Sequence, residues 1–168
     1  DQLMQQANEL GDYHVSHDGF STVVVSENKI FNEFSSGTPD LSAIRDFVRM
    51  FYKRANGDSS LMPKYLLLYG DGSYDNKGNI AGNKSLILTY ESVSSVNPTS
   101  SFVSDDYFGF LDDNEGGNIT DNSSLLDVAV GRLTVNDPTQ AEEVNNKIKV
   151  YTSPQSFGNW RNVVTFVA

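Results

Sequence analysis

Apolar residues recur at helical spacing most clearly in residues 38–57. Steps of three and four residues place them on one face, which predicts an amphipathic helix here. Thr38 is placed to cap this helix, Pro39 suits its first turn, and Asn56 with Gly57 ends it. The stripe consists of Leu41, Ile44, Phe47, Val48, Phe51 and Ala55.

Two further segments carry a helical stripe. In residues 136–151, Asp137 stands at the capping position and Pro138 in the first turn. Residues 3–10 carry a shorter stripe, which Gly11 is expected to close. The pattern therefore predicts three helices.

Residues 65–69 form a short, continuous apolar run, which is typical of a strand buried on both faces. Helical and strand-like segments alternate along the chain. We therefore predict an α/β domain with a mainly parallel sheet and flanking helices. The other strand candidates are residues 20–25, 85–92, 124–133 and 162–167.

Composition narrows the class of protein. The chain has 168 residues, enough for one well-buried domain. Its 22 acidic and 12 basic residues give a net charge of −10, which argues against a nucleic-acid partner. Cysteine is absent, so these residues offer no disulfide, thiolate metal site or cysteine nucleophile.

A glycine-rich turn follows the predicted strand at residues 65–69, in the order Gly70, Asp71, Gly72. Open parallel sheets bind ligands beyond the carboxyl ends of their strands, so Asp71 is the candidate for a substrate cleft. The alternative is a plain turn, in which the glycines supply the dihedral angles and Asp71 accepts hydrogen bonds from loop amides. The glycine pattern is not that of a nucleotide-binding loop.

A serine-based catalytic triad finds no support. Ser73 lacks the G-x-S-x-G surroundings of a hydrolase nucleophile. The only histidines, His14 and His17, lie near the amino end of the chain. We therefore expect no complete catalytic triad of this kind within these 168 residues.

Carboxylates gather in the long irregular segment 76–122, which exceeds an ordinary connector in length. This segment offers many carboxylate oxygens, the chain has no cysteine, and its histidines lie near the amino end. Such a set of ligands favours calcium over a transition metal. The alternative is a set of solvated turns, because each acidic motif is incomplete by itself. The candidate calcium ligands are Asp105, Asp106, Asp112 and Asp113.

Four ordered stretches give the chain a resemblance to the gingipain-type cysteine peptidases. They are "IFNEFSSGTPDLSAIRDFVRMFYKRA", "PKYLLLYGDGSYDNKGN", "SDDYFGFLDD" and "LDVAVGRLTVNDPTQAEEVNNKIKVY". The resemblance is greatest to the sortase-like branch that serves the type IX secretion system. The residues that match the early family motifs are Ser104, Asp105, Gly109, Val128, Val130, Gly131 and Arg132.

The resemblance implies a caspase-like α/β catalytic domain of two sub-domains, with the histidine and cysteine dyad in the second. Residues 1–168 are then the first, non-catalytic sub-domain, a fragment truncated at both ends. The parent protein is expected to be an enzyme and this chain alone inactive. No cofactor is required, although the family makes calcium a candidate. Arg132, near several carboxylates, is expected to be a structural ion-pair partner.

The resemblance also implies a biological role. The parent protein would remove C-terminal sorting domains from secreted cargo at the outer membrane, on the cell surface of a Gram-negative bacterium. Its partners would be the downstream catalytic sub-domain, the cargo proteins and other secretion components. The alternative is a non-enzymatic, acidic α/β binding module of a surface protein, which a downstream histidine and cysteine would argue against.

Overall fold

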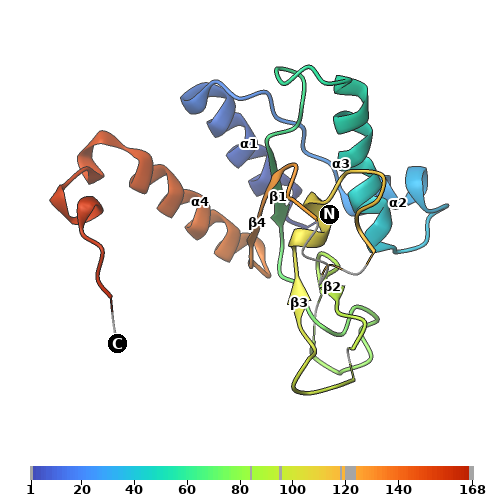
Figure 1. Cartoon of the computed structure of the whole chain (residues 1–168). Coiled ribbons are helices and arrows are strands. Elements are labelled where there is room, and N and C mark those ends of the chain that lie inside the picture. Colours follow the sequence, from blue (N-terminus) through green and yellow to red (C-terminus); the bar gives the residue numbers. More distant parts are fainter. Residues whose placement is uncertain (1, 84, 95, 118, 120–123, 167–168) are drawn as a thin grey trace.

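Two parallel strands lie at the centre of the fold, between helices (Figure 1). The computed structural model describes residues 2–83, 85–94, 96–117, 119 and 124–166. Strand β1 pairs with β4 in parallel, from Tyr65 opposite Ala129 to Tyr69 opposite Leu133. The main elements are α1 (Met4–Asp18), α2 (Glu27–Phe34), α3 (Leu41–Ala55), β1 (Tyr65–Tyr69), β4 (Ala129–Leu133) and α4 (Pro138–Thr152).

The helices form layers on both sides of the sheet. Helices α2 and α3 cover one face, where Ile44 and Val48 of α3 pack with Leu66, Leu68 and Val130 of the strands. Helices α1 and α4 lie on the other side and pack around the carboxyl end of β1. The prediction of an α/β fold with a parallel sheet and flanking helices is confirmed.

A small antiparallel hairpin lies beyond the carboxyl ends of the parallel strands. It consists of β2 (Tyr90–Glu91) and β3 (Val103–Ser104), and a 3-10 helix, η1 (Asp106–Gly109), follows it directly. In Figure 1 the hairpin projects below the central sheet. Two further 3-10 helices, η2 (Pro154–Ser156) and η3 (Asn159–Asn162), follow α4. No helix in the described part of the chain is long and apolar enough to cross a membrane.

The three predicted helices exist, with corrected ends. Helix α1 continues through Gly11 to Asp18, and Gly19 ends it with a left-handed φ of 71°. Helix α3 is capped by Asp40, which accepts a hydrogen bond from the amide of Ser42, so Thr38 is not its cap. Asp137 caps α4 as predicted. Helix α2 was missed, because its eight residues carry too short a stripe to stand out.

The strand predictions were less accurate. Residues 20–25 form no strand, because this segment packs against α1, with Val24 beside Gly11, and pairs with no neighbouring strand. Only part of residues 85–92 and 124–133 is β-structure. Residues 163–166 are not a strand, and residue 167 of that candidate lies outside the described part.

Strand β1 is also less buried than predicted. Leu68 is fully enclosed, but Tyr65 is 66% exposed and Leu67 is 44% exposed. Leu66 and Leu68 face the layer of α3, whereas α1 and α4 contact the other face mainly near Tyr69. At the amino-terminal end of that face Phe20 stacks on Tyr65, and both Tyr65 and Leu67 stay exposed.

Replacing the N-cap residue of α4 tests how much that cap contributes to stability. Asp137 accepts hydrogen bonds from the amides of Thr139 and Gln140, so Asp137→Ala should lower the free energy of unfolding by about 1 kcal/mol. Urea-induced unfolding measures the change. Glu143→Ala, on the exposed side of the same helix, is the control and should stay within about 0.5 kcal/mol of the parent. Equal losses in both variants would contradict the capping role.

Candidate functional site

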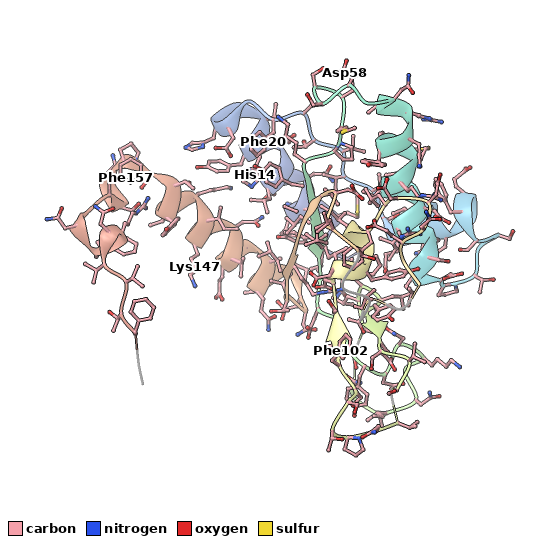
Figure 2. The ribbon with its side chains drawn as sticks, in the orientation of Figure 1. His14, Phe20, Asp58, Phe102, Lys147 and Phe157 are labelled. Carbon is pink, nitrogen blue, oxygen red and sulfur yellow. The ribbon has the colours of Figure 1, made fainter. Side chains whose placement is uncertain are left out.

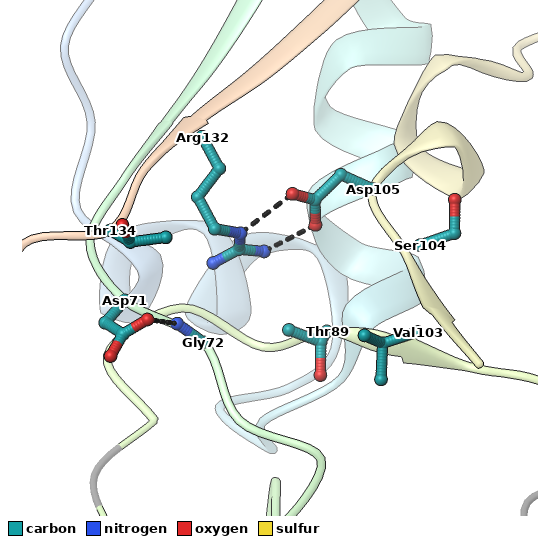
Figure 3. A pocket seen from close by; sticks show the side chains of 8 residues that line it. All are labelled: Asp71, Gly72, Thr89, Val103, Ser104, Asp105, Arg132 and Thr134. Carbon is teal, nitrogen blue, oxygen red and sulfur yellow. Dashed lines mark hydrogen bonds and ion pairs between the residues drawn. The ribbon is translucent and has the colours of Figure 1, made fainter. Parts of the chain in front are cut away.

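An open pocket of about 240 Å³ lies where β1 and β4 end (Figure 3). Strand β1 leads into the turn at Asp71, and β4 contributes Arg132 to the floor. Strand β3 and the residue after it form the opposite wall. The lining residues are Asp71, Gly72, Thr89, Val103, Ser104, Asp105, Arg132 and Thr134.

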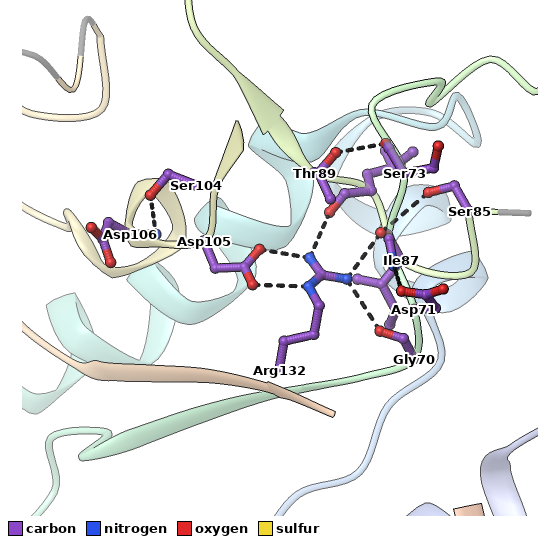
Figure 4. Close-up of polar contacts among 12 residues, drawn as sticks. Gly70, Asp71, Ser73, Ser85, Ile87, Thr89, Ser104, Asp105, Asp106 and Arg132 are labelled. Atoms are coloured by element: carbon purple, nitrogen blue, oxygen red, sulfur yellow. Dashed lines mark hydrogen bonds and ion pairs between the residues drawn. The ribbon is translucent and has the colours of Figure 1, made fainter. Parts of the chain in front are cut away.

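Arg132 uses every N–H of its guanidinium group (Figure 4). Nε and Nη2 donate to the two carboxylate oxygens of Asp105, at 2.8 and 2.7 Å. Nη1 donates to the carbonyl oxygens of Gly70 and Ile87, at 3.3 and 3.1 Å. Nη2 also donates to the carbonyl oxygen of Leu88, at 3.1 Å. A guanidinium group has five such donors, and all five are occupied.

Arg132 is therefore a structural group. Its side chain is only 9% exposed, and that of Asp105 is 27% exposed, so water competes little for this bidentate pair. The prediction that Arg132 is an ion-pair partner is confirmed. Gly72 leaves the necessary room, because a Cβ atom there would lie 2.9 Å from Nη1 of Arg132 and 2.4 Å from Thr89.

Asp71 lines the pocket and also organises its turn. Its Oδ1 accepts from the amide of Gly72 at 3.0 Å, and its Oδ2 accepts from the side chain of Asn136 at 3.1 Å. Its carbonyl oxygen accepts from the amides of Leu86 and Ile87. Asp71 forms no ion pair with a described residue, in contrast to Asp105. The turn role is thus established by geometry, and contact with a substrate stays a prediction.

The turn continues into a compact loop that is organised by Asp75. The amide of Ile80 donates to its carboxylate at 2.6 Å, and the side chain of Asn79 lies at 3.4 Å. Hydrogen bonds from these backbone and side-chain donors, above all from the Ile80 amide, lower the pKa of Asp75. Asp75 is buried and its charge is satisfied locally, so it belongs to the scaffold of the pocket.

The four predicted calcium ligands have different environments. Asp105 is paired with Arg132. Asp113 is paired with Arg49 and Lys53 of α3, and hydrogen bonding from Lys53 is the main cause of its lowered pKa. Asp106 is exposed at the start of η1. Among the described residues, Asp112 is the one member of the four that belongs to a group of carboxylates close enough to share an ion.

That group consists of Asp112, Glu115 and Asp127, whose nearest oxygens lie within 4.8 Å of one another. The hydroxyl of Tyr52 donates to Asp112 at 3.1 Å, which is the main reason that the pKa of Tyr52 is raised to about 12. The amide of Leu111 donates to Asp127 at 2.9 Å. Sequence reasoning did not select Glu115 and Asp127, because no spacing rule joins them to Asp112 before the loop is folded.

Two arginines of α3 hold the loop that carries this group. Arg45, which is buried, donates to the carbonyl oxygens of Phe110, Asp112 and Glu115. Arg49 lies one helical turn later and donates to the carbonyl of Leu111. The acidic segment is therefore anchored to α3 through its backbone.

The histidines lie away from the pocket. His14 and His17 sit near the end of α1, and both direct Nδ1 to the carboxylate of Asp18, at 2.6 and 2.7 Å. Figure 2 shows His14 on α1, far from the hairpin that carries Phe102. Neither residue lines the pocket.

Comparison with known proteins identifies the family. The family model described as peptidase family C25 matches residues 1–168. The chain belongs to peptidase family C25. Among solved structures, this C25 chain is similar to dimeric latent PorU from Porphyromonas gingivalis, with 34% sequence identity and a TM-score of 0.77. No curated protein matches the chain.

The similarity to PorU covers 97% of this chain and 16% of that chain. This C25 chain therefore spans only a small part of the length of its structural relative. The predicted resemblance to gingipain-type peptidases and the caspase-like α/β fold are confirmed. The catalytic activity, substrates and partners of the whole protein are a separate question.

Removing the guanidinium group of Arg132 tests its structural role. Arg132→Met leaves the carboxylate of Asp105 and three carbonyl groups without their donor, so the free energy of unfolding should fall by about 3 kcal/mol. Urea-induced unfolding measures this loss. Arg54→Met, at an exposed position of α3, is the control and should change it by less than about 0.5 kcal/mol. An Arg132 variant as stable as this control would contradict the structural role.

Calcium titration tests the cation prediction. The oxygens of Asp112, Glu115 and Asp127 suit a calcium ion in type, since calcium takes about six to eight oxygen ligands. Calcium is expected to raise the midpoint of thermal unfolding, because an ion that binds only the folded state stabilises it. Asp127→Asn should abolish the increase, and Asp106→Asn should leave it unchanged. Equal midpoints in calcium and in chelator would overturn the prediction.

Proposed function

We propose that this chain is the scaffold part of a cysteine peptidase of sortase type. The whole protein would remove C-terminal sorting domains from cargo of the type IX secretion system at the outer membrane. The single observation that carries the proposal is the similarity to PorU over 97% of the chain, within peptidase family C25. The motif resemblance to the sortase-like branch supports the same role.

The proposal assigns the chemical step to residues outside this chain. The nucleophile of a cysteine peptidase is a thiolate, which attacks a peptide carbonyl while a histidine transfers the proton. The resulting thioester is released by water or by an amine. This chain has no cysteine, and its histidines lie away from the pocket, so the dyad would come from the downstream sub-domain.

Within this proposal, the chain contributes one wall of the substrate cleft. Asp71 stands at the end of β1 with no cationic partner among the described residues, and it is the residue we assign to substrate contact. Arg132 and Asp105 keep that wall rigid. The partners of this surface would be the downstream sub-domain and the cargo protein.

The decisive experiment uses the full-length protein. It is incubated with a cargo protein that carries its sorting domain, and the products are identified by mass. Cleavage at the junction is expected, and replacing the predicted downstream cysteine by alanine should abolish it. Asp71→Asn should reduce kcat/KM by about tenfold or more while the fold stays intact.

Arg54→Met is the matched control within this chain and should cleave as well as the parent. If the parent and the cysteine variant both leave the cargo intact, the peptidase proposal fails. Binding of cargo without cleavage would then favour the alternative, a non-enzymatic acidic binding module. If the Asp71→Asn variant cleaves cargo normally, only the assignment of Asp71 to substrate contact fails.

A further inference from the structure

The β2–β3 hairpin has two edges, and residues of β3 line the pocket. Tyr90 lies opposite Ser104 and Glu91 lies opposite Val103. The amide of Ser92 donates to the carbonyl of Phe102. Hydrogen-bonded pairs alternate with non-hydrogen-bonded pairs in an antiparallel ladder, so Tyr90 and Ser104 also form a hydrogen-bonded pair. Val103 is therefore in a non-hydrogen-bonded pair, and its own N–H and C=O point away from β2.

The edge formed by β2 is partly closed. The backbone groups of Thr89 and Glu91 point outward from this edge, and the side chain of Asn76 satisfies both groups of Thr89. The amide of Thr89 donates to Oδ1 of Asn76 at 3.0 Å, and Nδ2 of Asn76 donates to the carbonyl of Thr89 at 2.7 Å. The carboxamide of Asn76 thus takes the place that the peptide group of a third strand would occupy.

The edge formed by β3 is open. Within the described part of the chain, no hydrogen bond reaches the outward N–H or C=O of Val103. Its side chain is 53% exposed. An edge strand with unpaired backbone groups is a template for another extended segment. The edge formed by β3 can therefore accept an extended segment.

The open edge borders the pocket. Val103 and Ser104 line it, together with Thr89 and Asp105, which lie on the same face of the hairpin as Val103. In a paired strand, alternate side chains point to opposite faces. A strand added at Val103 would direct every second side chain towards the pocket face, where Asp71 lies.

We infer that Val103 is a strand-pairing site for an extended peptide, the segment of the substrate that passes the pocket. The backbone of Val103 provides the hydrogen bonds, which are independent of peptide sequence, and the pocket selects among side chains. This inference rests on the proposed peptidase function and adds to it the conformation and register of the bound substrate. Two other occupants, a downstream segment of the same protein and a second copy, are tested as alternatives.

Hydrogen exchange tests the inference on the full-length protein with its predicted downstream cysteine replaced by alanine. The probe is a synthetic peptide that copies the junction between a cargo domain and its sorting domain. The amide of Val103 should exchange rapidly in the free protein and become protected when the peptide binds. Peptides that are N-methylated at one position at a time should then lose about tenfold in affinity only at the position whose N–H pairs with the carbonyl of Val103.

A variant pair checks the same contact from the side of the protein. Val103→Pro removes the outward N–H and should weaken peptide binding about tenfold, whereas Val96→Pro, in the exposed turn of the hairpin, should not. If Val103→Pro does not fold, the N-methylated peptides still test strand pairing at Val103. Insensitivity to N-methylation, or binding without protection of Val103, would overturn the inference and leave the peptidase function intact.

The alternatives give different results. Protection of Val103 before peptide is added would show that the edge is already occupied and would overturn the inference. Protection that rises with protein concentration identifies a second copy, and protection independent of concentration identifies a downstream segment. If the unmodified full-length protein cleaves no cargo, the proposed function itself fails, and the inference fails with it.

Discussion

The pocket depends on one guanidinium group. Arg132 projects from β4 and binds the carbonyl at the end of β1, two carbonyls of the segment that leads into the hairpin, and the carboxylate of Asp105. These groups come from segments that are far apart in sequence. A buried cation with five fixed donors can be satisfied only when all of these segments are in place. The position of the hairpin relative to the parallel strands follows from this requirement.

The surroundings of Arg132 show how the sequence meets that requirement. Asp105 supplies the opposite charge from the start of η1, and Gly72 supplies the space, since any larger residue would collide with the guanidinium group. The loop after β1 is stabilised separately by Asp75 and by the carboxamide of Asn76. The glycine and carboxylate residues that drew attention in the sequence are therefore mostly structural. Asp71 also organises its turn, and among the described residues it has no cationic partner.

Local patterns predicted the parts of the fold that local forces determine. The stripes of α3 and α4 and the cap at Asp137 are properties of neighbouring residues, and the structure contains them. Residues 20–25 show the limit of that approach, since a β-branched segment becomes a strand only beside a partner. The carboxylate group of Asp112, Glu115 and Asp127 was unpredictable for the same reason. Its members meet only after the loop has folded against α3.

Arg45 and Arg49 hold the acidic loop at residues 110–115 in a way that has an evolutionary consequence. Both guanidinium groups bind main-chain carbonyl oxygens of the loop, which every amino acid carries, and Arg49 also pairs with the side chain of Asp113. Loop side chains that make no such contact can therefore be exchanged without loss of the loop's path, provided that the small residue at Gly116 is kept beside Arg45. Related proteins can vary the charge and shape of this surface while its backbone stays in place. Selection can thus alter the loop's chemistry separately from its architecture.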